Sequence, residues 1–289
     1  MQSPGKKAVV FLAIAFAPVL FSVRSSGQIQ APAAVLDPAK MPDIVGVHVG
    51  MEPQEAMLIL RKQYPANFRF YVQPLDVAGL PAGQQARSDF LVSDPGTAEA
   101  PLAYLSFTMP PEKPVVWHAA RYARRIHTNR DTLLAALRQK YGKEAAALQT
   151  TGMNSQPARN DSEIAELFWL YDERGGRVPF PPESAFPQSR TIWECSDGRQ
   201  VAQLNDAQPV TPMDDEQMRT HQFAGVCGTL VVVHISIDPG PIVESAFTEM
   251  LDAPLALRTA HAFAVWQRGL IEKARKDDLE KSKQAKPVF

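Results

Sequence analysis

Hydrophobic and polar positions follow two different periods along this chain, and each change of period marks a new element. After Pro53, apolar residues recur three and four positions apart as far as Pro65, which is typical of an amphipathic helix. A second helical stripe starts behind Asn129, a good N-cap, and ends at Gly142, a good C-cap. A third begins after Asp252. The pattern therefore predicts three helices.

Short apolar and β-branched runs between these helices predict strands. They cover residues 68–72, 102–109, 115–126, 165–171, 190–194 and 228–238, and the polar, glycine-containing stretch 73–101 predicts a loop. The run 230–237 is the most apolar, which indicates a central strand. The order of elements predicts an α+β fold of two helix-then-antiparallel-sheet halves with a C-terminal helix.

The N-terminal segment has the layout of a secretory signal peptide. Lys6 and Lys7 precede an apolar run over residues 8–23, and small residues follow up to Gly27. We expect cleavage after Gly27, with Ala31 as the alternative, and a periplasmic or extracellular mature protein. An uncleaved membrane anchor is the other interpretation. Because no second long apolar run follows, we expect no stable membrane span after cleavage.

The remaining chain divides by composition. Residues 28–42 are rich in Pro and Ala and predict a linker, and residues 273–289 form a charged tail. Between them we expect a first α+β half at 43–127 and a second half with the closing helix at 128–272. Each opening helix ends in a tyrosine, Tyr64 or Tyr141, although a true repeat stays open.

The two cysteines, Cys195 and Cys227, both belong to the mature part. An even count in an oxidising compartment predicts a disulfide. It would close a loop of about 33 residues and contribute roughly 3–4 kcal/mol in the chain-entropy model. Buried free thiols or a reactive pair are the alternatives.

The charge balance of the mature chain and the absence of known catalytic or ligand-binding motifs argue against several classes of function. The leader takes three basic residues, which leaves 27 basic against 31 acidic residues and argues against a nucleic-acid partner. The sequence contains no nucleophile elbow, phosphate-binding loop, dinucleotide fingerprint or helical zinc motif, so we expect no cofactor and no metal and assign no catalytic residue.

The densest basic cluster consists of Arg121, Arg124 and Arg125, with Arg130 beyond them. The three arginines lie on one expected strand with an aromatic residue and a histidine, and together these form the candidate binding patch. Its residues are Trp117, His118, Arg121, Arg124 and Arg125. Arginines beside aromatic rings suit an anionic group or an acidic partner. The plainer interpretation is an exposed strand face paired with acids.

Other residues support alternative functions. A hydrolase with a scattered site would draw first on His118, Arg121 and His127, and a small-ligand or glycan site on Trp117, Trp169 and Trp193. These tryptophans also suit a core. We interpret His234, inside the apolar run, as a hydrogen-bonded core histidine, with a ligand or base as the alternative.

The segment 46–56, GVHVGMEPQEA, resembles the opening motif of small exported α/β modules. These are the BamE-type outer-membrane assembly lipoproteins and the β-lactamase-inhibitor-like proteins. The resemblance implies helices packed on a small antiparallel sheet and a role in binding other proteins. Glu52 stands where the motif has Ser or Thr, and the lipid-bearing cysteine is absent, so membrane anchoring does not carry over.

The sequence thus predicts an exported, non-catalytic cell-envelope protein that acts by protein–protein binding, as an assembly factor, scaffold or inhibitor. A small-ligand or glycan-binding protein and a hydrolase are the alternatives.

Overall fold

The computed structural model describes residues 41–75, 86–94, 102–149, 157–172, 174–179, 228–237 and 242–284. The chain separates into two compact units, Met1–Ala34 and Val35–Phe289, and all described residues belong to the second. Among the helices in these ranges, none combines the length and the hydropathy needed to cross a membrane. The expected signal peptide, both cysteines, Trp193 and the expected strand 190–194 lie outside the described residues.

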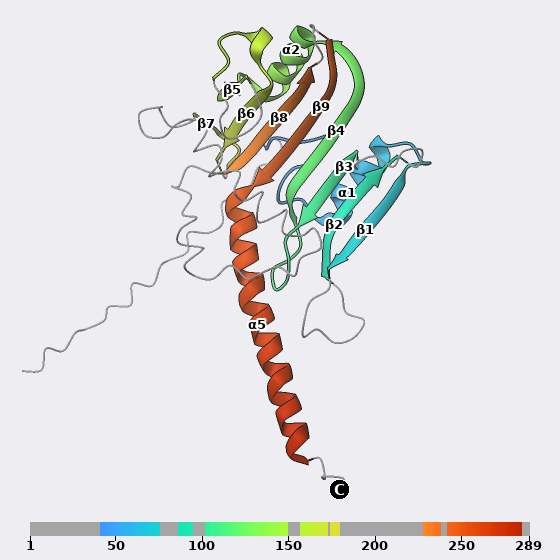
Figure 1. Cartoon of the computed structure of the whole chain (residues 1–289), viewed down its shortest axis with the longest axis vertical. Helices are drawn as coiled ribbons and strands as arrows, with labels where there is room; N and C mark the ends of the chain where they lie inside the picture. The colour runs from blue at the N-terminus through green and yellow to red at the C-terminus, as the bar shows by residue number, and fades with distance from the viewer. Residues whose placement is uncertain are drawn as a thin grey trace, which may run out of the picture. The chain divides into compact units, whose positions relative to one another are not determined.

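The described strands form one antiparallel sheet (Figure 1). They are β1 (Arg69–Leu75), β2 (Ala86–Ser93), β3 (Ala103–Phe107), β4 (Val116–Asn129), β5 (Ala146–Leu148), β6 (Glu166–Tyr171), β7 (Arg177–Val178), β8 (Thr229–Ile237) and β9 (Ile242–Asp252). Their order across the sheet is β1-β2-β3-β4-β9-β8-β6-β5, with β7 also paired to β6. The pairing of β4 with β9 therefore joins the two halves at the centre.

Helices alternate with these meanders as the sequence predicts. Helix α1 (Pro53–Gln63) precedes β1 to β4, and α2 (Arg130–Tyr141) precedes β5, β6, β8 and β9. A short 3₁₀ helix η1 (Asp161–Glu163) lies before β6, and α5 (Ala253–Gln284) follows β9. The α+β class, with helix-then-antiparallel-sheet halves and a C-terminal helix, is confirmed.

Local chemistry sets the ends of the helices. Pro53 occupies the first position of α1, and its C-cap is Tyr64, directly before Pro65. The Oδ1 of Asn129 accepts a hydrogen bond from the backbone N–H of Asp131 at 2.8 Å, which caps α2. Gly142 ends α2 with φ 79°, a conformation that favours glycine. The predicted caps are confirmed.

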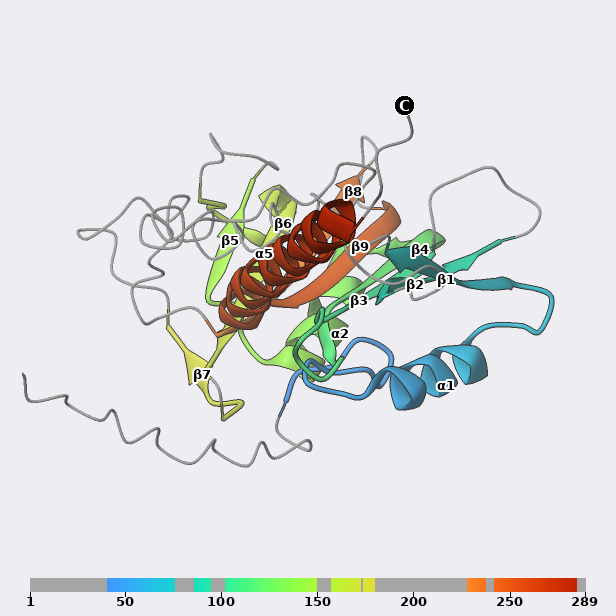
Figure 2. The ribbon, with the colours of Figure 1, turned by 90° about the horizontal axis from the view of Figure 1, so that it is seen from below.

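The sheet buries apolar side chains on both faces. One face packs against α1 and α2 through residues such as Leu60, Leu134 and Met250 (Figure 2). The other face carries a smaller cluster that includes Phe168, Val232, Leu251 and Ala253, the first residue of α5. Alternation of side chains along each strand produces these two faces.

Strand β4 is bent by a bulge, in agreement with the expected long, bent strand. Its register against β9 shifts between Arg124 and Thr128, and Arg125 and His127 adopt left-handed φ angles of 52° and 40°. Extra residues in one strand increase its bend and twist. Ile126, between them, packs against the main core.

The prediction of a loop over residues 73–101 is wrong in part, because β2 lies within this range. Phe90 and Val92 of this strand are fully buried, while Asp89 alternates with them. Leu91, an apolar residue on the other face, interrupts the strict apolar–polar alternation that would have predicted a strand. Strand β9 was not expected either, because Glu244, Ser245 and Glu249 interrupt its apolar pattern.

Candidate functional site

Five ionisable side chains form a line on the sheet face opposite α1 and α2, and we call them the buried row. They are Tyr104 of β3, His118 of β4, Glu249 of β9, His234 of β8 and Glu166 of β6. These five strands are consecutive neighbours in the sheet. Strand register explains the line, since Glu166 is directly opposite His234, and His118 and His234 are diagonal to Glu249.

Distances along the row show a continuous set of polar contacts. The Nδ1 atom of His234 lies 2.5 Å from Glu166 Oε1, and its Nε2 atom lies 3.1 Å from Glu249 Oε1. The Nε2 atom of His118 lies 3.5 Å from Glu249 Oε2 and 3.3 Å from the Tyr104 hydroxyl. Carboxylates and imidazoles thus alternate across the centre of the sheet.

The row is shielded from solvent. The side chains of His118, Glu249 and Glu166 are 3, 0 and 8% exposed, and that of His234 is 20% exposed. An ionised carboxylate only accepts hydrogen bonds, so an imidazole held between two carboxylates carries a proton on both nitrogens. Burial alone lowers the pKa of His234, but the bonds to Glu166 and Glu249 outweigh it and raise the pKa to about 9.

This arrangement limits the chemistry of the row. A doubly protonated His234 has no free lone pair, so it does not serve as a general base. His118 is buried, and its Nδ1 atom has no hydrogen-bond partner among the described residues. Within the same residues, no group of three His, Cys, Asp or Glu side chains is arranged to hold a metal ion.

The residues of the candidate binding patch lie in different surroundings. Trp117 and His118 are buried, with ring centroids 5.3 Å apart. Arg121 is exposed and lies beside Tyr64, where burial raises the pKa of the tyrosine and the guanidinium opposes that rise. The Arg124 guanidinium lies 4.8 Å from the ring centroid of Tyr122. Arg125 is exposed in the bulge of β4.

Residues of the two alternative sites are placed as follows. His118 and His127 are nine positions apart on β4, roughly 25–30 Å at about 3.3 Å per residue, so one small substrate would not reach both. Trp117 and Trp169 are 5% and 1% exposed, and Trp169 donates a hydrogen bond to the carbonyl of Gly142 at 2.9 Å. Both indole rings therefore belong to the interior.

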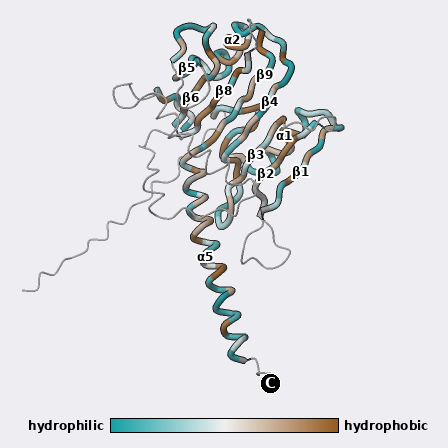
Figure 3. The backbone as a smooth tube through the Cα atoms, viewed as in Figure 1, coloured by the Kyte–Doolittle hydropathy of each residue, from teal (hydrophilic) through white to brown (hydrophobic). Residues whose placement is uncertain are grey.

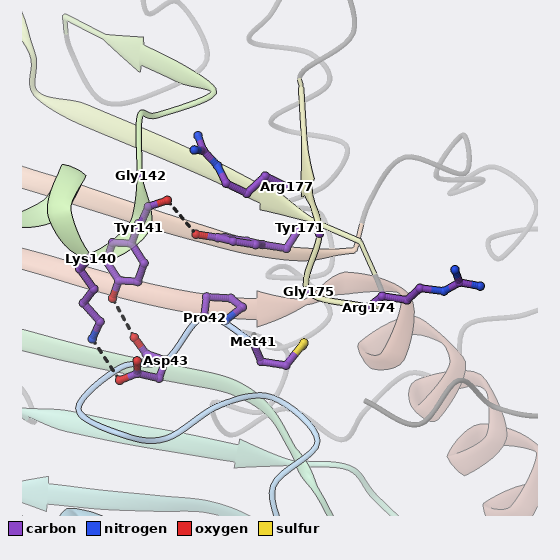
Figure 4. Close-up of a pocket in the computed structure, with 11 residues that line it drawn as sticks. Met41, Pro42, Asp43, Lys140, Tyr141, Gly142, Tyr171, Arg174, Gly175 and Arg177 are labelled. Atoms are coloured by element: carbon purple, nitrogen blue, oxygen red, sulfur yellow. Dashed lines mark hydrogen bonds and ion pairs between the residues drawn. The ribbon is translucent and has the colours of Figure 1, made fainter. Parts of the chain in front are cut away.

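A surface hollow of about 570 Å³ lies where the described chain begins, beside the end of α2 (Figure 4). It is lined by Met41, Pro42, Asp43, Lys140, Tyr141, Gly142, Tyr171, Arg174, Gly175, Gly176 and Arg177. Tyr141 donates its hydroxyl to the carbonyl of Asp43 at 2.8 Å, and Tyr171 donates to the carbonyl of Tyr141 at 3.2 Å. Burial raises the pKa of Tyr171 to about 12.

The polar groups around this hollow serve the fold. Lys140 pairs with the Asp43 carboxylate at 3.0 Å, and Arg177 donates to the carbonyl of Lys143. The side chains of Arg174 and Arg177 extend in different directions and do not meet at one point (Figure 4). A specific small-ligand site needs polar groups that converge on the ligand. We therefore do not assign this hollow as a small-ligand site.

No family model, curated protein or solved structure matches the chain. Sequence reasoning identified His118 and His234 but missed Tyr104, Glu166 and Glu249. The available signal was a glutamate inside an otherwise apolar strand, as at Glu166 before Leu167 to Tyr171.

Proposed function

We propose that this chain is an exported cell-envelope protein that acts, without catalysis, by binding another protein. The observation that carries the proposal is the exposure of the second half of α5. Residues 268–283 are exposed except Leu270, which is half-buried. Figure 3 colours this part of the helix as mostly hydrophilic with isolated apolar residues.

The first turns of α5 anchor it to the described body of the chain. Ala256, Ala260 and Phe263 are buried, and Thr259 donates a hydrogen bond to Glu112 at 3.0 Å. The N–H of Leu255 is capped by the carboxylate of Asp252 at 2.9 Å. The helix therefore has a fixed base and a solvent-exposed continuation.

The exposed continuation has little to hold it as a helix. It has two exposed ion pairs, Lys281 with Asp278 at 3.8 Å and Lys283 with Glu280 at 2.7 Å, each typically worth well under 1 kcal/mol. Helices in proteins obtain most of their stability from packing of an apolar face. Burial of exposed apolar residues against a partner would supply that packing.

Apolar side chains for such contact are present. Ile271 and Leu279 of this continuation are 46 and 54% exposed, and Val265, shortly before it, is 51% exposed. The buried row favours a non-catalytic role, because its ionisable groups are bonded to one another beneath the surface. Export through a signal peptide at residues 1–27 and a protein partner in the envelope remain parts of this proposal.

Affinity capture from envelope extract tests the proposal with two variants of the mature chain. We expect the double variant Ile271→Asp, Leu279→Asp to lose the partner that the native protein retains. The control, Lys273→Gln with Lys276→Gln, alters exposed polar positions of the same segment that make neither of these ion pairs, and it should retain the partner. Equal capture by both variants, at equal thermal stability, contradicts the proposal.

Export is tested separately by mass spectrometry of the protein recovered from its native cells. The proposal expects a new N-terminus after Gly27 or Ala31 on material from outside the cytoplasm. An intact Met1 on cytosolic protein contradicts this part.

A further inference from the structure

The buried row has a role that protein binding does not use. We propose that it is a proton-binding site, which couples the stability of the central sheet to pH through a single imidazolium held between two buried carboxylates. The ligand is the proton, and the residues that bind it are Glu166, His234 and Glu249. This inference is independent of whether α5 binds a partner.

Geometry gives the first step of the argument. Both nitrogens of His234 lie within hydrogen-bond distance of a carboxylate oxygen, 2.5 Å for Glu166 and 3.1 Å for Glu249. Both bonds require N–H donors when both carboxylates are ionised, and only the protonated ring supplies two. The positive ring also balances negative charge in surroundings where the Glu249 side chain is fully buried.

Loss of the proton from His234 removes one of these hydrogen bonds and the positive charge that balances the carboxylates. The neutral ring keeps one N–H, so one nitrogen presents a lone pair to a carboxylate that also only accepts. Two buried negative charges then face each other across an uncharged ring, and burying an uncompensated charge is costly. The raised pKa of His234, about 9, reflects this balance.

The other groups on this face complete the electrostatic surroundings. Glu166 faces His234 from β6 and Glu249 faces it from β9, while His118 of β4 contacts the second oxygen of Glu249. Tyr104 of β3 follows behind His118. Two more ionisable groups of β4, Tyr122 and Arg124, lie on the same face but farther from His234. Phe247 of β9 is paired with both Tyr122 and His234 and therefore separates them. Among the described residues, the carboxylates are thus the only charged groups that contact His234 directly.

The site lies where the two halves of the sheet join. Glu249 is on β9, which pairs with β4 of the first half and with β8 of the second. Deprotonation of His234 should therefore loosen β6, β8 and β9 first. Since Asp252 at the end of β9 caps α5, loosening should extend to the base of that helix.

Histidine NMR titration of the full mature chain, with hydrogen exchange of the strand amides, tests the inference. In the native protein we expect the His234 ring to titrate at least one pH unit above an unfolded histidine. We expect the protection factors of the β8 and β9 amides, which are corrected for the intrinsic rise of exchange with pH, to fall above that midpoint. Glu166→Gln should lower the midpoint by one pH unit or more. The control Glu55→Gln, an exposed acid of α1, should leave it unchanged.

Two results overturn the inference. The first is a His234 midpoint at or below that of an unfolded histidine, which the native protein alone can reveal even if a variant fails to fold. The second is a raised midpoint with no change in the protection factors of the β8 and β9 amides across it.

Discussion

The Nδ1 atom of His234 and the Oε1 atom of Glu166 lie 2.5 Å apart at directly opposed positions of β8 and β6. The raised pKa of His234 makes this imidazole positively charged at neutral pH, in the most apolar of the described strands. Glu249 contacts the other ring nitrogen, so the histidine is satisfied on both sides. The charge is tolerated because its partners come from the two strands that flank β8.

Global stability should fall at alkaline pH. The pKa of His234 is raised from 6.5 unfolded to about 9 folded, so its contribution is complete below pH 6.5 and is lost as pH rises through about 9. The shift corresponds to about 3 kcal/mol. Urea unfolding measured between pH 6 and 10 should show this decline. A stability that is flat or rising over that range contradicts it.

Helix α1 offers a matched pair of leucines. Leu60 is buried in the main core, whereas Leu58 is 58% exposed. We expect Leu60→Ala to lower the free energy of unfolding by about 2–5 kcal/mol, since it leaves a cavity, and Leu58→Ala to change it by less than about 1 kcal/mol. Chemical denaturation of both variants measures the difference. Similar losses would show that α1 is not packed as described.

The stability that the N-cap contributes to α2 should depend only on whether the side chain of residue 129 offers a hydrogen-bond acceptor. Asn129→Ala removes the bond to the Asp131 N–H and should cost about 1 kcal/mol. Asn129→Asp keeps an acceptor at the same place and should preserve most of the stability. Thermal unfolding of the two variants compares them, and an equal loss in both argues against capping.

Two glycines should respond in opposite directions to alanine. Gly142 has φ 79°, and a Cβ there would meet the guanidinium of Arg177, so Gly142→Ala should destabilise by about 1–3 kcal/mol. Gly269 lies within α5 with open space around it, so Gly269→Ala should strengthen the exposed helix by about 1 kcal/mol. Hydrogen exchange of residues 270–283 reports the second effect. No slowing of exchange there would contradict it.

The sequence was most informative where structure depends on neighbours along the chain. Asn129 and Gly142 fix α2 through bonds within four residues of each cap, and Pro53 and Pro65 bound α1 in the same way. Such signals depend only on residues that are close in the sequence, so inspection of the sequence detects them. The prediction of His234 as a hydrogen-bonded histidine of the sheet interior is also confirmed.

The two glutamates that contact His234 could not be predicted from the sequence, for a physical reason. Glu166 and Glu249 become acceptable inside the sheet only through contacts between strands that are distant in sequence. Seen alone, Glu249 interrupts an apolar pattern and argues against a strand, so β9 was missed. Long-range pairing supplies the compensation that local propensity lacks.

The exposed half of α5 is the basis of the proposed function, and photo-cross-linking in the native cells tests it most directly. A photoreactive residue at Ile271 should give a discrete adduct with one envelope protein. The same residue at Leu58, an apolar side chain of similar exposure on α1, should not. Adducts at neither position, or equal adducts at both, would contradict the assignment of α5 as the binding element.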